Sequence, residues 1–204
     1  MSVYIIGGGT PLPGRLSQAE SRMRTMIGVM AQKGANATRL QQTLLGDGRG
    51  RLMLAAKFDS FHEAMSIFEE VRKDPLFIEV SKQISENPAA SDSWAVVMRD
   101  FYGSLDFSKS VTLRRTYKIS RGHLPKMTEI IKEIDNLSPD YKVAAIIPAM
   151  APNMDYLHGA YHFDSLADAG KSMDEVGMTT EFQELVSRAN EIATLIQSGI
   201  SVKM

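Results

Sequence analysis

The sequence has no cysteine among its 204 residues, which excludes disulfide bonds, thiolate metal ligands and cysteine nucleophiles. It also has no apolar run near the roughly 18 residues that a membrane helix requires. At the N-terminus, a basic segment followed by a long apolar one is missing, so we expect no signal peptide. These absences predict a cytoplasmic protein that has no membrane partner.

An excess of charge of one sign is missing as well. The chain has 23 Lys and Arg against 24 Asp and Glu, a formal net charge of −1 at pH 7. Proteins that bind nucleic acid show a basic face or stripe, and neither half of this sequence is basic. We therefore expect no nucleic-acid partner.

Three motifs that would define a chemistry are incomplete. Residues 3–9 run from an apolar segment into three glycines, yet a dinucleotide-binding fingerprint needs a third glycine where a leucine stands between two prolines. We expect these glycines to form a loop beside a pocket or over one end of a barrel. His62 and Glu63 begin a zinc motif that lacks its second histidine, and no G-x-S-x-G segment occurs. The sequence therefore predicts neither a metal site nor a serine hydrolase.

What the sequence does contain is an internal repeat. Residues 58–64, FDSFHEA, return as residues 163–169, FDSLADA, and further pairs keep the same displacement of 105 positions. A period of half the chain indicates a duplicated domain, since solenoid repeats run roughly 20–50 residues. We predict one repeat over residues 1–105 and a second over residues 106–204. The small and polar segment 103–110 would link them.

Each repeat shows the pattern of strand, helix, strand, strand, helix, short helix and strand. Apolar residues recur at i, i+3, i+4 and i+7 in the first helix of each repeat, and a glycine-rich turn at residues 46–50 separates two strands. Capping boxes at Ser17, Ser60 and Ser165 predict helix starts. The expected strands are residues 3–6, 38–45, 51–58, 93–101, 111–119, 142–147, 156–163 and 194–202.

Several predicted strands are apolar on both faces, for example residues 52–56, 94–98 and 143–147. A sheet with helices on one side only would alternate more strictly between apolar and polar residues. Each sheet is therefore expected to have helices on one face and the sheet of the other repeat on its other face.

This duplicated β-α-β-β-α-β plan resembles the dimeric α/β-barrel superfamily, in which two ferredoxin-like units pack sheet to sheet. The motif that carries the resemblance is an aromatic at the end of the third strand, then x-Ser, an Ala in the next helix and a later Phe. It is present as Phe58, Ser60, Ala64 and Phe77, and as Phe163, Ser165, Ala169 and Phe182. It is similar to antibiotic-biosynthesis monooxygenases, their haem-degrading relatives and NIPSNAP-type domains. The resemblance implies an α+β fold in which one chain supplies both units of an intramolecular α/β barrel.

The resemblance also bears on cofactors and on assembly. Haem-degrading members of this group carry Trp at the positions of Phe58 and Phe163, and a His ten residues later. Here those later positions are Phe68 and Met173, which do not ligate iron as His does. We therefore expect no cofactor. Because one chain replaces the family's usual homodimer, the protein is expected to be a monomer or to form a further homodimer.

The candidate catalytic residues lie on one predicted strand. His158 and His162 share a strand face by the alternation of side chains. At about 3.3 Å per residue they stand roughly 13 Å apart, too far to hold one metal. Either one can act as a general base, since the unperturbed pKa of histidine, about 6.5, lies near neutral. The alternative is a polar strand face that is partly wet at the mouth of a barrel.

Neighbouring side chains are candidates for ligand binding. Tyr156 shares the strand face of the histidines. Arg115 and Tyr117 share a face of the adjacent strand, where they would supply an anion anchor and a phenolic hydrogen bond, and Arg114 points the other way. If Arg115 shares an interior face with the histidines, its burial requires a partner or a ligand.

Aromatic side chains on the opposite face would shape an apolar pocket. Tyr161, Phe163 and Phe58 are expected to point toward the helices, where methionines offer an adaptable lining; a plain hydrophobic core is the alternative. Two functions follow from these residues. The first is an enzyme for a small apolar or aromatic molecule, a cofactor-independent oxygenase or isomerase with a histidine base. The second is a non-catalytic ligand-binding or protein-interaction module.

Overall fold

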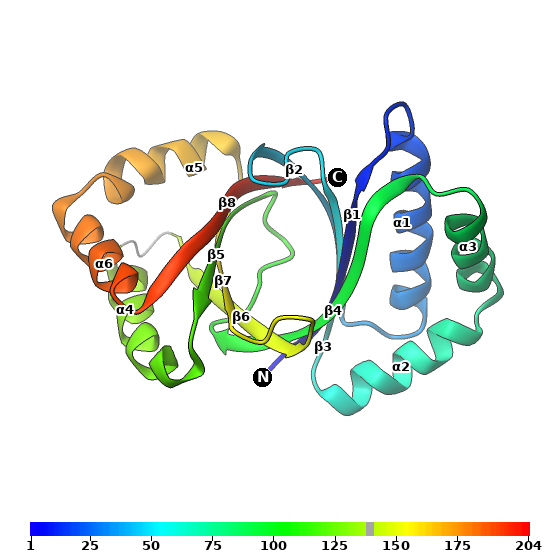
Figure 1. Cartoon of the computed structure of the whole chain (residues 1–204), viewed down its shortest axis with the longest axis horizontal. Helices are drawn as coiled ribbons and strands as arrows, with labels where there is room; N and C mark the ends of the chain where they lie inside the picture. Colours follow the sequence, from blue (N-terminus) through cyan, green and yellow to red (C-terminus); the bar gives the residue numbers. More distant parts are fainter. Residues whose placement is uncertain (138–140) are drawn as a thin grey trace.

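The computed structural model describes residues 1–137 and 141–204, and the strands within these ranges form one closed antiparallel barrel (Figure 1). The strand order around the barrel is β1-β3-β2-β8-β5-β7-β6-β4. The helices lie outside the barrel in two groups, one beside each half of the chain (Figure 1). The predicted α+β fold, two ferredoxin-like units in an intramolecular α/β barrel, is confirmed.

The elements follow the predicted order. The first half contains β1 (Val3–Pro11), α1 (Leu16–Gln32), β2 (Ala37–Gly46), β3 (Leu52–Phe58), α2 (Phe61–Lys73), α3 (Pro75–Glu86) and β4 (Ala90–Tyr102). The second half contains β5 (Val111–Ile119), the 3-10 turn η1 (Arg121–His123), α4 (Leu124–Leu137), β6 (Val143–Met150), β7 (Tyr156–Phe163), α5 (Leu166–Ser172), the π-helical turn η2 (Met173–Gly177), α6 (Thr180–Asn190) and β8 (Ala193–Lys203). The division into repeats at residues 105 and 106 stays a prediction.

Two strand pairs join the halves. Strand β2 pairs with β8, for example Gln42 opposite Val202, and β4 pairs with β6, for example Met98 opposite Pro148. These pairs satisfy backbone groups that would otherwise be exposed at the edges of two open sheets. The inner faces of both sheets therefore surround one common interior.

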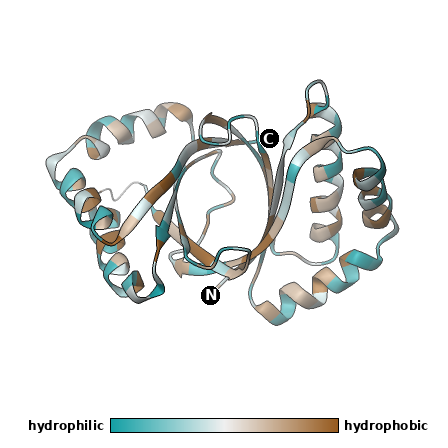
Figure 2. Cartoon of the chain, in the orientation of Figure 1, coloured by the Kyte–Doolittle hydropathy of each residue, from teal (hydrophilic) through white to brown (hydrophobic). Residues whose placement is uncertain are grey.

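The helices cover the outer face of the barrel with their apolar sides. In the second half, Met127, Ile130 and Ile131 of α4 are buried against Leu157 of β7. In the first half, Phe58 packs with residues of α1 and α2. Hydrophobic stretches recur along the strands, whereas hydrophilic residues are frequent on the helices (Figure 2). No helix in the described ranges is long and apolar enough to cross a membrane.

Two of the three predicted helix caps are present. The Ser60 and Ser165 hydroxyls each accept the backbone N–H three residues ahead, both at 3.1 Å. The cap at Ser17 is wrong, because α1 already begins at Leu16 and Ser17 lies within it. The turn before it contains Gly14 at a φ of +73°, which brings the chain into the helix earlier than the side-chain pattern indicates.

The glycines at positions 7–9 do not form the expected loop but lie inside β1, paired with β3 and β4. The small space beside the strand explains why these positions are glycines. A Cβ on Gly8 would lie 2.7 Å from the Leu52 carbonyl oxygen and 3.1 Å from the Trp94 ring. Glycine thus lets Trp94 and the neighbouring backbone approach β1 closely.

Candidate functional site

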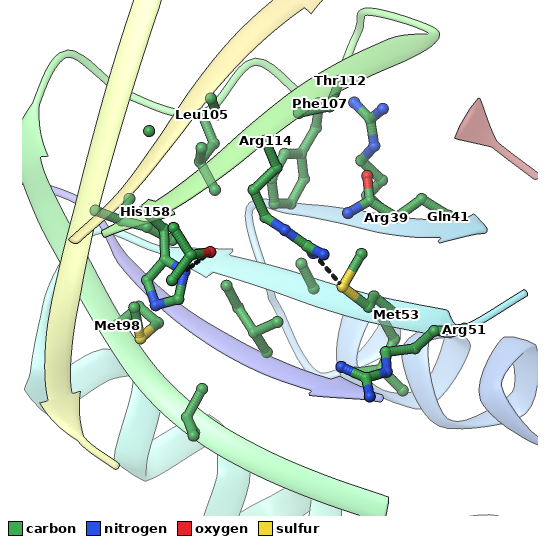
Figure 3. Close-up of a pocket in the computed structure, with 18 of the residues that line it drawn as sticks. Arg39, Gln41, Arg51, Met53, Met98, Leu105, Phe107, Thr112, Arg114 and His158 are labelled. Atoms are coloured by element: carbon green, nitrogen blue, oxygen red, sulfur yellow. Dashed lines mark hydrogen bonds between the residues drawn. The ribbon is translucent and has the colours of Figure 1, made fainter. Parts of the chain in front are cut away.

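The interior of the barrel contains a cavity of about 150 Å³, to which every strand and the segment between β4 and β5 contribute. A cavity of this order accepts a benzene-sized molecule. Its lining includes Ile6, Arg39, Gln41, Arg51, Met53, Trp94, Val96, Met98, Leu105, Phe107, Thr112, Arg114, Thr116, Ile146, His158, His162 and Gln197 (Figure 3).

Both candidate catalytic histidines line this cavity. On β7, His158 lies opposite Thr116 of β5, and His162 lies opposite Thr112. Directly opposed residues of an antiparallel pair share one face of the sheet. The inner face of β5 therefore carries Thr112, Arg114 and Thr116.

The expected common face of Arg115 and the histidines is not observed. Arg115 lies opposite Gly159, so it points to the helices, and Arg114 occupies the interior position instead. Sequence alternation shows that adjacent arginines face opposite ways, but which one faces His158 depends on the register between β5 and β7.

Arg115 and two predicted aromatic ligands meet on the helix side. The Arg115 guanidinium lies 5.7 Å from the ring centroid of Tyr161 and 5.4 Å from that of Phe182. Together with Phe163 they line a second cavity of only about 30 Å³, roughly the share of one water molecule in the liquid. Burial raises the pKa of Tyr161 to about 12, so its hydroxyl stays protonated.

The other predicted ligand residues lie outside the barrel cavity. Tyr117 packs against the helix-side core of the second half, and Phe58 is fully buried in that of the first half. Tyr156 stands beside His158 with the two rings edge to face, their centroids 6.2 Å apart, and its hydroxyl lies 3.3 Å from the Asn153 amide. Among these residues, only Tyr156 is near the histidines.

His158 is held by one hydrogen bond and has a free ring nitrogen. Its Nδ1 lies 3.0 Å from the Thr116 hydroxyl, which is fully buried (Figure 3). Within the described ranges, its Nε2 has no hydrogen-bond partner. Burial, reinforced by the charge of Arg114, lowers the pKa of His158 to about 4. The imidazole is therefore neutral at pH 7, with one nitrogen available to a molecule in the cavity.

His162 uses both ring nitrogens to hold the protein together. Its Nε2 accepts the backbone N–H of Asp106 at 3.4 Å, and its Nδ1 lies 3.3 Å from the Thr112 hydroxyl. Because Nε2 accepts, the proton of the neutral ring is on Nδ1, which donates to Thr112. Burial and the charge of Arg39 lower its pKa to about 4.

The segment 103–110, expected to be a simple linker, closes one end of the cavity; we call it the plug. Its Leu105 and Phe107 line the cavity, and in Figure 1 it passes within the outline of the barrel. Arg39 donates to plug carbonyls, with 2.8 Å to that of Lys109. The Tyr4 hydroxyl accepts the Leu105 N–H at 3.1 Å and donates to Asp100 at 2.6 Å.

The far end of the cavity reaches solvent. Gln197, which lies opposite Thr116, is exposed and lines the cavity there. Residues near that end, Arg51 and Trp94 among them, were not predicted from the sequence as site residues. The polar residues at positions 39 and 41, alternating with the buried Leu40, were a usable signal for an inward polar face on β2.

Comparison with known proteins shows the fold. No family model and no curated protein matches the sequence. Two solved structures described as "putative monooxygenase" match nearly the whole chain. The one from Lactobacillus acidophilus is 10% identical over 99% of this chain and 93% of that one, with a TM-score of 0.65. The one from Fusobacterium nucleatum is 8% identical over 100% and 93%, with a TM-score of 0.67.

An anthrone oxidase-like protein is also similar, 9% identical over 100% of this chain and 91% of that one, with a TM-score of 0.60. These neighbours have dimeric α/β-barrel folds, and this chain has that fold too, as the resemblance predicted. Sequence identities this low show that the fold is shared, but they do not show that the reaction is shared.

Proposed function

We propose that this chain binds a small organic molecule in the barrel cavity and that His158 removes a proton from it, as the base of a cofactor-independent oxygenase. The observation that supports this most is the Nε2 of His158 at the wall of the cavity, which has no hydrogen-bond partner in the part of the chain that the structure describes, while Nδ1 lies 3.0 Å from the Thr116 hydroxyl. The oxygenase labels of the structural neighbours agree with the proposal.

The orientation of the ring suits a base. When Nδ1 donates its proton to the Thr116 hydroxyl, the lone pair lies on Nε2, toward the cavity. With a pKa of about 4, His158 is a weak base. It therefore suits a substrate whose C–H or O–H is already acidic, such as a methylene beside an aromatic ketone or a phenol.

The reaction balances with dioxygen as the oxidant. Loss of a proton to His158 leaves a carbanion, which gives its electrons to O₂. A methylene then becomes a ketone: two C–H bonds break, one oxygen atom forms the new C=O bond and the other leaves as water.

The experiment measures oxygen uptake with anthrone, the molecule that the name of one structural neighbour suggests. Its size exceeds that of the cavity, so one ring would enter at the open end. We expect uptake by the wild type and a loss of about 100-fold in His158→Gln, the usual contribution of a general base. His62→Gln, a change at an exposed histidine on α2, is the matched control and should retain full activity.

Other outcomes separate the alternatives. Unchanged uptake in His158→Gln contradicts the role of base. Exchange of anthrone methylene protons in D₂O without oxygen uptake indicates an isomerase-type reaction. Binding with neither exchange nor uptake favours the second candidate, a non-catalytic binding protein, which the lowered pKa of His158 supports.

A further inference from the structure

The Arg114 guanidinium lies inside the barrel and has few hydrogen-bond partners among the described residues. Within the described residues, its guanidinium donates one hydrogen bond, from Nη1 to the Met53 sulfur at 2.7 Å (Figure 3). A thioether is a weak acceptor, and a guanidinium has five N–H donors. No carboxylate in those ranges lies within ion-pair distance of it. The side chain thus has free donors directed at the cavity.

Arg51 adds a second, poorly satisfied cation on the other side of Met53 (Figure 3). Its Nε is buried and has no hydrogen-bond partner in the described part of the chain. Burial and the positive charge of Arg51 both lower the pKa of Arg114, and Asp47 acts in the opposite direction. The Asp47 carboxylate is engaged at the hairpin, where it accepts the Ser198 N–H at 3.0 Å. The two arginines therefore repel each other without a carboxylate between them.

Two further arginines on the barrel strands have more partners than Arg114 has. The two terminal nitrogens of Arg39 donate to three plug carbonyls, although its Nε, like that of Arg51, has no hydrogen-bond partner among the described residues, and Arg115 stacks over two aromatic rings. A cation taken from water without a partner is costly, so proteins pair buried charges or leave them for a ligand. No aspartate or glutamate is part of the described cavity lining.

The rest of the lining defines the remainder of the ligand. Apolar side chains of β1, β4 and the plug line the same cavity as the arginines; they are Ile6, Trp94, Val96, Met98, Leu105 and Phe107. Their cavity holds about one benzene ring. A planar carboxylate matches the guanidinium fork through two parallel hydrogen bonds.

We infer that Arg114 and Arg51 form a receptor for the carboxylate of a single-ring aromatic ligand, whose ring occupies the apolar part of the barrel cavity. The inference rests on the proposed function, since it names the class of molecule that the same cavity takes. It also links binding to chemistry. Burial is the main cause of the lowered pKa of His158, and the charge of Arg114 is the second; a carboxylate on Arg114 offsets this second cause.

The test compares benzoate with benzamide, which has nearly the same shape and no charge. Trp94 is the only tryptophan and lines the cavity, so its fluorescence reports occupancy, with calorimetry as a second measurement. In low-chloride buffer, we expect the wild type to bind benzoate at least about tenfold more tightly than benzamide. Acetate should bind much more weakly than benzoate, because it lacks the ring.

Two variants test which arginine binds the carboxylate. Arg114→Met should bring benzoate down to the affinity of benzamide, whereas Arg115→Met, the adjacent arginine on the opposite face, should keep the preference. Because Arg114 has no carboxylate partner among residues 1–137 and 141–204, we expect the melting temperature of ligand-free Arg114→Met to equal or exceed that of the wild type. A melting temperature well below the wild type would show that Arg114 serves the fold.

The outcomes distinguish this inference from the proposed function. Equal binding of benzoate and benzamide overturns the receptor and leaves the ligand cavity standing. A benzoate preference that survives in Arg114→Met overturns the role of Arg114. Acetate binding as tight as benzoate overturns the aromatic ligand. Failure of both ring compounds to bind contradicts the cavity itself, and the proposed function with it.

Discussion

The two ends of the barrel cavity carry the same pair of residue types and use them differently. Each has a histidine on β7 bound to a threonine on β5, and burial lowers both histidine pKa values to about 4. At the plugged end, the second ring nitrogen of His162 accepts a hydrogen bond from the Asp106 backbone N–H. At the open end, the second nitrogen of His158 is free within the described residues. The surroundings of the two histidines therefore differ in one respect: they leave the Nε2 of His158 open to the cavity and engage that of His162.

The largest expected effect is on the pH dependence of stability, and it involves His162 at the plugged end. The folded-state pKa of His162 lies below the ordinary value of about 6.5, so the unfolded chain binds the proton more tightly. The contribution of His162 to the free energy of unfolding is complete above about pH 6.5. As the pH falls toward 4, the free energy of unfolding decreases by up to about 3 kcal/mol because of this residue. Denaturant unfolding at several pH values should show a shallower acid decline in His162→Gln. An unchanged slope relative to the exposed-site control His62→Gln contradicts this.

A second prediction concerns the anchor of the plug at Tyr4. Tyr4→Phe removes the bond to Asp100 and the acceptor of the Leu105 N–H, so unfolding should become easier by about 2 kcal/mol. Hydrogen exchange at the Leu105 amide should accelerate more than in Tyr102→Phe. In that control, the lost bond is to Asp135 of α4. Equal exchange at Leu105 in both variants would show that the plug does not depend on Tyr4.

The third prediction addresses the open end. Thr116→Val removes the hydroxyl that orients His158 and should lower turnover about tenfold, or about 1.4 kcal/mol in the barrier. Thr116→Ser should restore the rate, and the pH–rate profile should shift in the valine variant only. A purely structural threonine would change the melting temperature and leave that profile alone.

The smallest effect is the matching change at the plugged end. Thr112→Val leaves the Nδ1–H of His162 without an acceptor, which should cost about 1 kcal/mol of stability. Turnover should stay as in the wild type. If Thr112→Val and Thr116→Val reduce turnover equally, the functional contrast between the two ends is wrong.

Strand content and topology could be predicted because several levels of the sequence agree. The bounds of β5 and β7 match the prediction residue for residue, since both runs are rich in strand-forming residues and turn residues flank them. Strand β1 was predicted too short, because glycines usually end a strand. Here the backbone carbonyls of the neighbouring strands, and at Gly8 the Trp94 ring as well, leave little room for a Cβ, and those contacts are invisible in a single sequence.

The candidate site was predicted only in part. Alternation placed both histidines on one face, but the register that selects Arg114 over Arg115 arises from strand pairing. The composition of the plug indicated a linker, and the segment connects β4 to β5. Its two apolar side chains, Leu105 and Phe107, were the signal that it folds inward, and their value depends on a barrel interior that only the assembled sheets create.

The plug has a consequence for which part of the proposed ligand would meet the protein. It is joined covalently to β4 and β5 and hydrogen-bonded to the barrel wall, so it forms the floor of the cavity. Under the proposed function, a cavity with one closed end would bind the end group of a molecule, and a longer molecule would leave its remainder in the solvent. Compounds that share one terminus and differ in length would then compete for the same site.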